Sequence, residues 1–151
     1  MVTAVSLHIL AAIVWIGGMF FAVLVLRPAA GPLEPPARLA LWRRVFARFF
    51  PWVWLALVLL LGTGYWMIFE IFGGLGDLPL HFHLMQGIGW LMALIYLYLW
   101  FAPYKRFKEA LDAGETPVAA ATLNRIRWIV TANLALGLIN AVIGASGGYW
   151  T

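Results

Sequence analysis

The sequence predicts an all-α fold, an integral membrane bundle of four antiparallel helices. Of the 151 residues, 64% are hydrophobic and only 11% are charged, whereas a soluble domain is about 45–50% apolar and about 25% charged. The apolar residues also gather in four runs, each close to the roughly 20 residues that cross the hydrocarbon core of a bilayer. We therefore predict a single four-helix domain over residues 1–151, with the lipid bilayer as its surroundings.

The predicted spans follow from these runs and from the breaker residues between them. In chain order they cover residues 3–26, 51–72, 79–102 and 126–146. The first span is expected to end at Arg27-Pro28. The second is expected to start near Pro51, because proline is favoured in the first turn of a helix, and to stop at Gly73-Gly74.

The third and fourth spans have their own boundary signals. Asp77 is the expected N-cap of the third, with Pro79 in the first turn, and Pro103 follows its end. Thr116-Pro117 has the character of a helix start, so the fourth span is open to being one long helix that begins there and ends at residues 146–148.

The basic residues predict the orientation. All ten lie in two of the connections: Arg27, Arg38, Arg43, Arg44 and Arg48 in the first, and Lys105, Arg106, Lys108, Arg125 and Arg127 in the other. Short cytoplasmic loops hold the Lys/Arg excess of membrane proteins, so both termini should lie on the outer side of a bacterial plasma membrane. The positive charge therefore indicates topology and anionic lipid, not nucleic acid. The Arg-rich amphipathic segment 37–50 is expected to lie along the headgroups.

The absence of cysteine limits the cofactor chemistry. No disulfide, thiolate metal site, CxxC motif or c-type haem attachment is available, so histidine, methionine, carboxylate or carbonyl groups must hold any metal. The sequence also contains no HExxH motif, nucleophile elbow or P-loop, which argues against hydrolytic and phosphate chemistry.

Polar residues in the spans predict which helix faces point inward, because a polar side chain in hydrocarbon is costly. Helical spacing gives four stripes: His8, Ala12, Trp15, Met19 and Ala22; Thr63, Met67 and Glu70; His83, Gly87, Trp90 and Leu94; and Asn133, Gly137, Asn140 and Gly144. The glycines and asparagines also suit ordinary helix–helix packing and interhelical hydrogen bonds.

Depth suggests that two imidazoles meet. His8 and His83 each lie about six residues from the outer end of their span, which is roughly 9 Å of helix, and Asn140 lies at a similar level. We therefore predict a polar layer in the outer leaflet in which His8 faces His83. His81 lies on another side of its helix, where an interfacial position is expected and a solvent-side ligand or proton-relay role is open.

Several stretches resemble a known family. "LHILAAIVWIGGMFFAVLVLRPA", "WRRVFARFFPWVWLALVLLLGTGYWMI", "HLMQGIGWLMALIY" and "IRWIVTANLALGLINAVIG" are similar, in this order, to the CopD copper-resistance family. A weaker likeness connects the chain with HemJ-type protoporphyrinogen oxidases, compact four-helix membrane proteins associated with b-type haem. The resemblance implies a metal or haem function, with His8 as the residue that carries over best and His83 as the next candidate.

Three functions are open at this point. The first is the binding of haem b, with His8 and His83 as axial ligands. Gly87 and Gly137 would leave room for the porphyrin, and its walls would be Trp15, Trp90 and Tyr65. Asn140 would orient one of the two ligands. Such a protein would be a membrane haem oxidoreductase that exchanges electrons with a quinone or a periplasmic partner. The sequence does not indicate an oligomeric state, so both a monomer and a homo-oligomer are compatible with it.

The second function is copper binding or transport, with His8 and His83 as ligands and with His81, Met67 and Met85 as further donors. A transporter needs polar sites at several depths, whereas the predicted polar layer is mainly a single outer one, which favours a bound cofactor. The third function is a non-enzymatic scaffold whose polar residues only pack helices.

Overall fold

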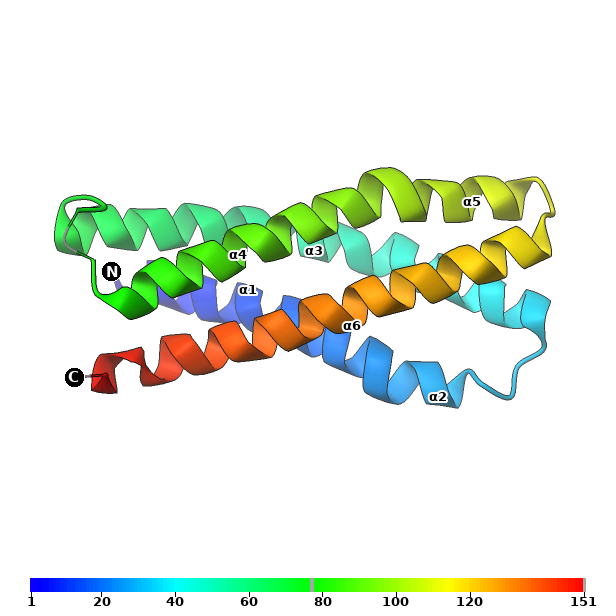
Figure 1. Cartoon of the computed structure of the whole chain (residues 1–151), viewed down its shortest axis with the longest axis horizontal. Coiled ribbons are helices and arrows are strands. Elements are labelled where there is room, and N and C mark those ends of the chain that lie inside the picture. The colour runs from blue at the N-terminus through cyan, green and yellow to red at the C-terminus, as the bar shows by residue number, and fades with distance from the viewer. Residues whose placement is uncertain (77, 151) are drawn as a thin grey trace.

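A computed structural model of the chain describes residues 1–76 and 78–150 (Figure 1). Helix α1 (Val2–Phe20) continues through the π-helical η1 (Phe21–Leu26) into α2 (Arg27–Ala29), and α3 covers Pro35–Phe72. Helix α4 (Leu80–Leu99) continues through the π-helical η2 (Trp100–Tyr104) into α5 (Lys105–Asp112). The last helix, α6 (Thr116–Ser146), ends in the 3-10 turn η3 (Gly147–Tyr149).

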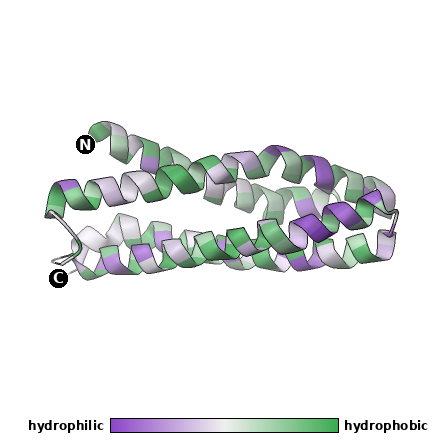
Figure 2. Ribbon diagram, turned by 90° about the horizontal axis from the view of Figure 1, so that it is seen from above, coloured by the Kyte–Doolittle hydropathy of each residue, from purple (hydrophilic) through white to green (hydrophobic). Residues whose placement is uncertain are grey.

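The fold is all-α, and four continuous helical segments are long and apolar enough to cross a membrane. Both termini lie at one end of the bundle, together with the connection between α3 and α4 (Figure 1). Hydrophilic residues gather toward the other end (Figure 2). The helices therefore run alternately up and down, as the four predicted spans require, and which end faces the cell exterior stays a prediction.

Helix α3 differs from the prediction at its start, because it begins at Pro35 and runs through Pro51 without a break. The expectation that segment 37–50 lies along the headgroups is wrong. Its apolar stripe is buried in the bundle, where Phe46 contacts the rings of Tyr104 and Phe107 at centroid distances of 6.1 and 5.9 Å. Burial of this stripe outweighs the single backbone hydrogen bond that a proline removes.

The third span also runs further than expected, through Pro103 to Asp112. Proline cannot donate a backbone hydrogen bond and crowds the carbonyl four residues earlier, and a local π-helical turn relieves both problems. The π-helical η2 contains Pro103, and η1 similarly ends two residues before Pro28. The predicted cap Asp77 lies outside the described residues, and Pro79 is the N-cap of α4. Helix α6 begins at Thr116, which confirms the long form of the fourth helix.

The helices associate as two pairs, α1 with α3 and α4 with α6. A cluster of aromatic rings fills the space between the pairs, and Tyr96 lies at its centre. Its ring contacts Trp15, Phe50 and Trp54 at centroid distances of 6.1, 5.8 and 5.4 Å. Its hydroxyl donates to the carbonyl oxygen of Phe50 at 3.0 Å. This cluster closes the middle of the bundle, so the polar residues toward the termini form a separate region.

Candidate functional site

His8 lies on the face of α1 that packs against α3. Its ring is half-buried, and its Nδ1 atom is 2.9 Å from Oγ1 of Thr63. A Cβ atom on Gly64 would lie only 3.4 Å from Cε1 of His8, so the glycine gives the imidazole room beside the α3 backbone. The prediction that both His8 and Thr63 point inward is consistent with this contact.

The hydrogen bonds of Thr63 favour one protonation of the His8 ring. A threonine hydroxyl has one proton, and Thr63 donates it to the carbonyl oxygen of Leu59. With the hydroxyl proton used in this way, the proton between His8 and Thr63 comes from Nδ1 of His8. In the neutral ring this leaves Nε2 unprotonated, with a lone pair directed away from Thr63. A histidine that ligates a metal is held in this way, with one ring nitrogen donating to a neighbour and the other free to coordinate.

The stripe predicted on the first span is confirmed as an inward face. Trp15 and Met19 are buried, with 4% and 3% of their surface exposed, and Ala12 and Ala22 are half-buried. Trp15 belongs to the aromatic cluster through Tyr96. It therefore separates His8 from the middle of the bundle.

The stripe predicted on the third span is on the wrong face. His83, Gly87, Trp90 and Leu94 are all exposed, whereas Met92, Tyr96 and Leu99 are buried. At 100° per residue, His83 lies about 160° around α4 from Met85, which is on the inward side. His83 is in the first turn of α4, and a polar side chain so close to a helix end reaches water or headgroups without turning inward. The structure therefore does not bring His83 to His8.

Two other predicted site residues do meet, at the surface. The Nε1 atom of Trp90 donates to the hydroxyl of Tyr65 at 2.8 Å, and Trp90 is 45% exposed. The pair links α3 to α4 from outside the bundle. Neither side chain forms a wall beside His8.

The glycines of α6 serve close helix packing. A Cβ atom on Gly137 would lie 3.0 Å from Ile16 and 3.1 Å from Met92, so three helices meet there. At Gly144 the corresponding position is 2.8 Å from the methyl group of Met85. The space that these glycines leave is already filled by side chains. With His83 on the outer face of α4, the arrangement does not fit a porphyrin ligated by both imidazoles.

Asparagines on α6 supply polar atoms that have no partner. The Oδ1 atoms of Asn133 and Asn140 are buried and, within residues 1–76 and 78–150, accept no hydrogen bond. A buried acceptor without a partner costs free energy comparable to a lost hydrogen bond. Asn140 lies one turn before Gly144, against which Met85 packs. Asn140 on α6 and the Met85 side chain that packs on α6 therefore lie in the same half of the bundle, about one helical turn apart along α6.

Counting along the helices places His8 at the level of Met85. Ile16 contacts Gly137, and α1 and α6 run in opposite directions. Seven residues from this contact, toward the end that holds the termini, are Ile9 on α1 and Gly144 on α6. Met85 packs on Gly144, so His8 and Met85 share a level to within about one helical turn.

The candidate site is completed by α3. Met67 is half-buried and lies one turn beyond Thr63. Each of the four long helices thus carries one candidate metal ligand in the half of the bundle that holds the termini: His8, Met67, Met85 and Asn140. We call this set the donor layer.

His81 lies nearer the end of the bundle than the donor layer. Its ring packs where a Cβ atom of Gly147 would be, and it lies 6.1 Å from the ring of Trp150. It fastens the start of α4 to the C-terminal turn. A role as a solvent-side ligand is not supported by these contacts.

The described residues contain no group of three or more His, Cys, Asp or Glu side chains able to hold a metal ion. Any metal site here must therefore use methionine or amide donors beside His8. The sequence suggested Asn140 as the side chain that orients the histidine, whereas the structure places Thr63 in contact with the His8 ring. The signal was available, because Thr63 lies on the predicted inner face of its helix.

Comparison with known proteins agrees with the sequence resemblance. Residues 43–146 match the family described as copper resistance protein D, CopD. The matched range contains Met67, Met85 and Asn140, and His8 precedes it. Neither the curated proteins nor the solved structures include a match. Because the match covers more than half of the chain, the protein is a multi-pass membrane protein of the CopD family.

Proposed function

We propose that the protein binds copper in the interior of its bundle, with Nε2 of His8 as the principal ligand. The observation that carries the proposal is the hydrogen bond between His8 and Thr63, with Thr63 donating in turn to Leu59. This arrangement orients the ring and leaves one nitrogen free. Imidazole is a good ligand for copper in either oxidation state.

The rest of the donor layer favours reduced copper. Thioether groups are soft ligands that select Cu(I) over harder cations, and Met67 and Met85 are half-buried in the same half of the bundle. The unpartnered oxygen of Asn140 can accept a hydrogen bond from a water held with the ion. A copper site of this kind would serve the uptake or storage of copper, in keeping with the family description.

A copper titration tests this proposal. The full chain, purified in detergent, is titrated with Cu(I) in competition with a chromophoric chelator. We expect one high-affinity ion per chain, and we expect His8→Ala to weaken binding at least about tenfold, the range seen when metal sites lose an orienting or ligating group. His83→Ala is the matched control, because that ring is exposed on the other face of α4 and should leave binding unchanged.

Three outcomes would overturn the proposal. They are the absence of copper binding, an affinity that His8→Ala leaves intact, and an equal loss in His83→Ala. Haem b, the other ligand expected from the sequence, is tested on the same sample. A Soret absorption band that disappears in His8→Ala would assign the histidine to haem instead, and a colourless protein that binds neither ligand would favour a scaffold.

A further inference from the structure

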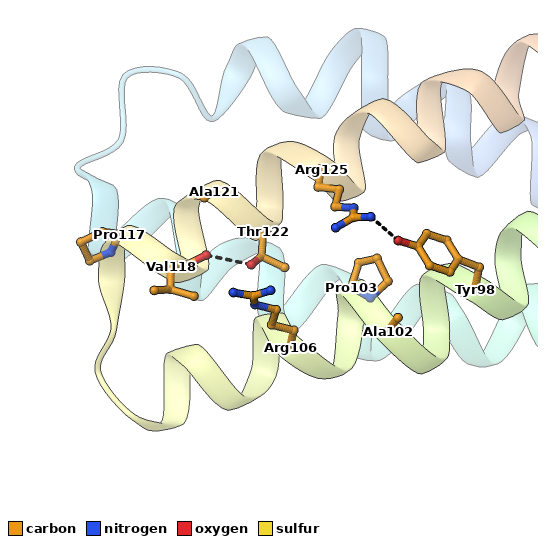
Figure 3. A pocket seen from close by; sticks show the side chains of 9 residues that line it. All are labelled: Tyr98, Ala102, Pro103, Arg106, Pro117, Val118, Ala121, Thr122 and Arg125. Atoms are coloured by element: carbon orange, nitrogen blue, oxygen red, sulfur yellow. Dashed lines mark hydrogen bonds between the residues drawn. The ribbon is translucent and has the colours of Figure 1, made fainter.

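The end of the bundle opposite the termini holds a groove between α6 and the segment formed by α4, η2 and α5 (Figure 3). Its volume is about 500 Å³. Two arginines point into it, Arg106 from α5 and Arg125 from α6 (Figure 3). Pro103 and Val118 form apolar parts of its lining. The groove is therefore both basic and apolar, and it is remote from the donor layer.

Neither arginine is neutralised by a carboxylate. The ion pairs among the described residues join Arg43 to Asp112 and Lys105 to Glu109. Arg106 and Arg125 are exposed and belong to neither pair. Among the described residues both guanidinium groups lack acidic partners, and they line one groove at different heights, Arg106 toward Val118 and Thr122 and Arg125 against Tyr98 (Figure 3), so the groove carries positive charge that suits a phosphate group.

The Arg125 side chain is held in place before any ligand binds. Its Nη2 atom donates to the hydroxyl of Tyr98, and its guanidinium carbon lies 5.7 Å from the centroid of the Tyr98 ring. A group that is already ordered loses less conformational entropy when a ligand arrives.

The position of the groove along the bundle suits a lipid headgroup. Tyr98 lies 18 residues after Leu80, where α4 begins, and this is about 27 Å of helix. The hydrocarbon core is about 30 Å thick. Arg106, two turns beyond Tyr98, therefore falls at the level of the phosphates, while the apolar lining near Pro103 adjoins the acyl chains.

We propose that this groove is a binding site for one anionic phospholipid, whose headgroup lies along the two arginines, with its phosphate at Arg106, and whose acyl chain follows the apolar lining. The complementary charge and the position at the edge of the hydrocarbon carry the proposal. It is independent of copper binding. Binding in the groove differs from the general attraction between basic residues and the membrane surface in its stoichiometry, which is one lipid per chain.

Native mass spectrometry of the full chain tests the site. We expect phosphatidylglycerol to remain bound in a 1:1 complex and phosphatidylcholine to bind at least about tenfold more weakly. The double variant Arg106→Gln/Arg125→Gln should lose the preference for phosphatidylglycerol. The single variant Arg106→Gln leaves the contact of Arg125 with Tyr98 in place and should weaken binding about fivefold, the effect of one basic residue near a membrane surface.

The matched control is Arg44→Gln/Arg48→Gln, which removes the same charge from the exposed surface of α3. It should bind phosphatidylglycerol like the unaltered chain. Equal losses in both double variants would show that only overall charge matters and would overturn the site. Displacement of the lipid by millimolar inorganic phosphate would also overturn it, since the groove would then take free phosphate. Thermal unfolding without lipid identifies variants that fail to fold.

Discussion

At the scale of single residues, the contact with Thr63 determines how the His8 ring is oriented. The contact with Thr63 is a side chain–side chain hydrogen bond between two helices. Thr63 is itself fixed by the carbonyl of Leu59 in its own helix. The chain of three groups favours a proton on Nδ1 of His8. In the proposed copper site, Thr63 would orient the ligand without itself binding the metal.

The first prediction removes that hydroxyl. Thr63→Val keeps the shape of the side chain and deprives Nδ1 of His8 of its acceptor, so the ring loses its fixed orientation. We expect the affinity for Cu(I) to fall about 10- to 100-fold, as for other groups that orient a metal ligand. The measurement is the same chelator competition as for the unaltered chain.

The control is Thr131→Val. Thr131 also donates to a carbonyl of its own helix, that of Arg127, at 2.8 Å, and it has no bond to a histidine. Its loss should leave copper affinity unchanged. If both variants bind copper like the unaltered chain, Thr63 does not orient a ligand.

At the scale of helices, the bundle depends on the close approach of α1, α4 and α6 at Gly137. Side chains of Ile16 and Met92 lie where a larger residue would extend. The same three helices carry His8, Met85 and Asn140. Packing at Gly137 therefore sets the spacing of the donor layer, one to two turns away.

The second prediction overfills this contact. Gly137→Leu should destabilise the protein by roughly 1–3 kcal/mol, the usual cost of forcing extra volume into a packed interior. Thermal unfolding in detergent measures the change. Gly87→Leu is the control, because nothing lies within 4 Å of a Cβ atom there and the residue is exposed. Equal effects at both positions would mean that helix propensity, not packing, decides stability.

The third prediction concerns the ion pair that joins α3 to α5. Nη1 of Arg43 lies 2.6 Å from Oδ1 of Asp112, and both side chains are well exposed, at 44% and 61%. Exposed pairs contribute little, so Asp112→Asn should cost less than about 1 kcal/mol. The difference in melting temperature should vanish in about 1 M salt, which screens charges beyond roughly 3 Å. A large loss of stability that salt leaves unchanged would assign Asp112 a different role.

The helices show how far the sequence alone could lead. Apolar length predicted all four spans, and the inward face of the first was confirmed because Trp15 and Met19 are large and deep in the span. The predicted inward face of the third span was wrong because His83 was assumed to be a buried polar residue. His83 lies in the first turn of α4, where a polar side chain can reach water. The continuous α3 was missed because Pro51 resembled a start signal, while the burial of Phe46 and Phe50 depends on partners far away in the sequence.

At the scale of the whole molecule, the bundle is longer than the membrane core. Helix α3 has 38 residues and therefore measures about 57 Å, whereas the hydrocarbon is about 30 Å thick. The excess lies at the end with the arginines, where the stripe that includes Phe46 packs on α5. One end of the molecule is thus a basic helical projection with the proposed lipid groove at its base. The other end holds the termini and the donor layer.

The last prediction fixes which end is outside. The chain contains no cysteine, so one introduced thiol is the sole target of a maleimide reagent that cannot cross membranes. Gly76 and Ala113 lie at opposite ends of the bundle, and both are exposed. The Lys/Arg excess beside Ala113 predicts that this end lies in the cytoplasm. In intact cells, Gly76→Cys should be labelled and Ala113→Cys should react only after permeabilisation. The reverse pattern would invert the predicted orientation and place the donor layer, with the proposed copper site, in the cytoplasmic half of the membrane.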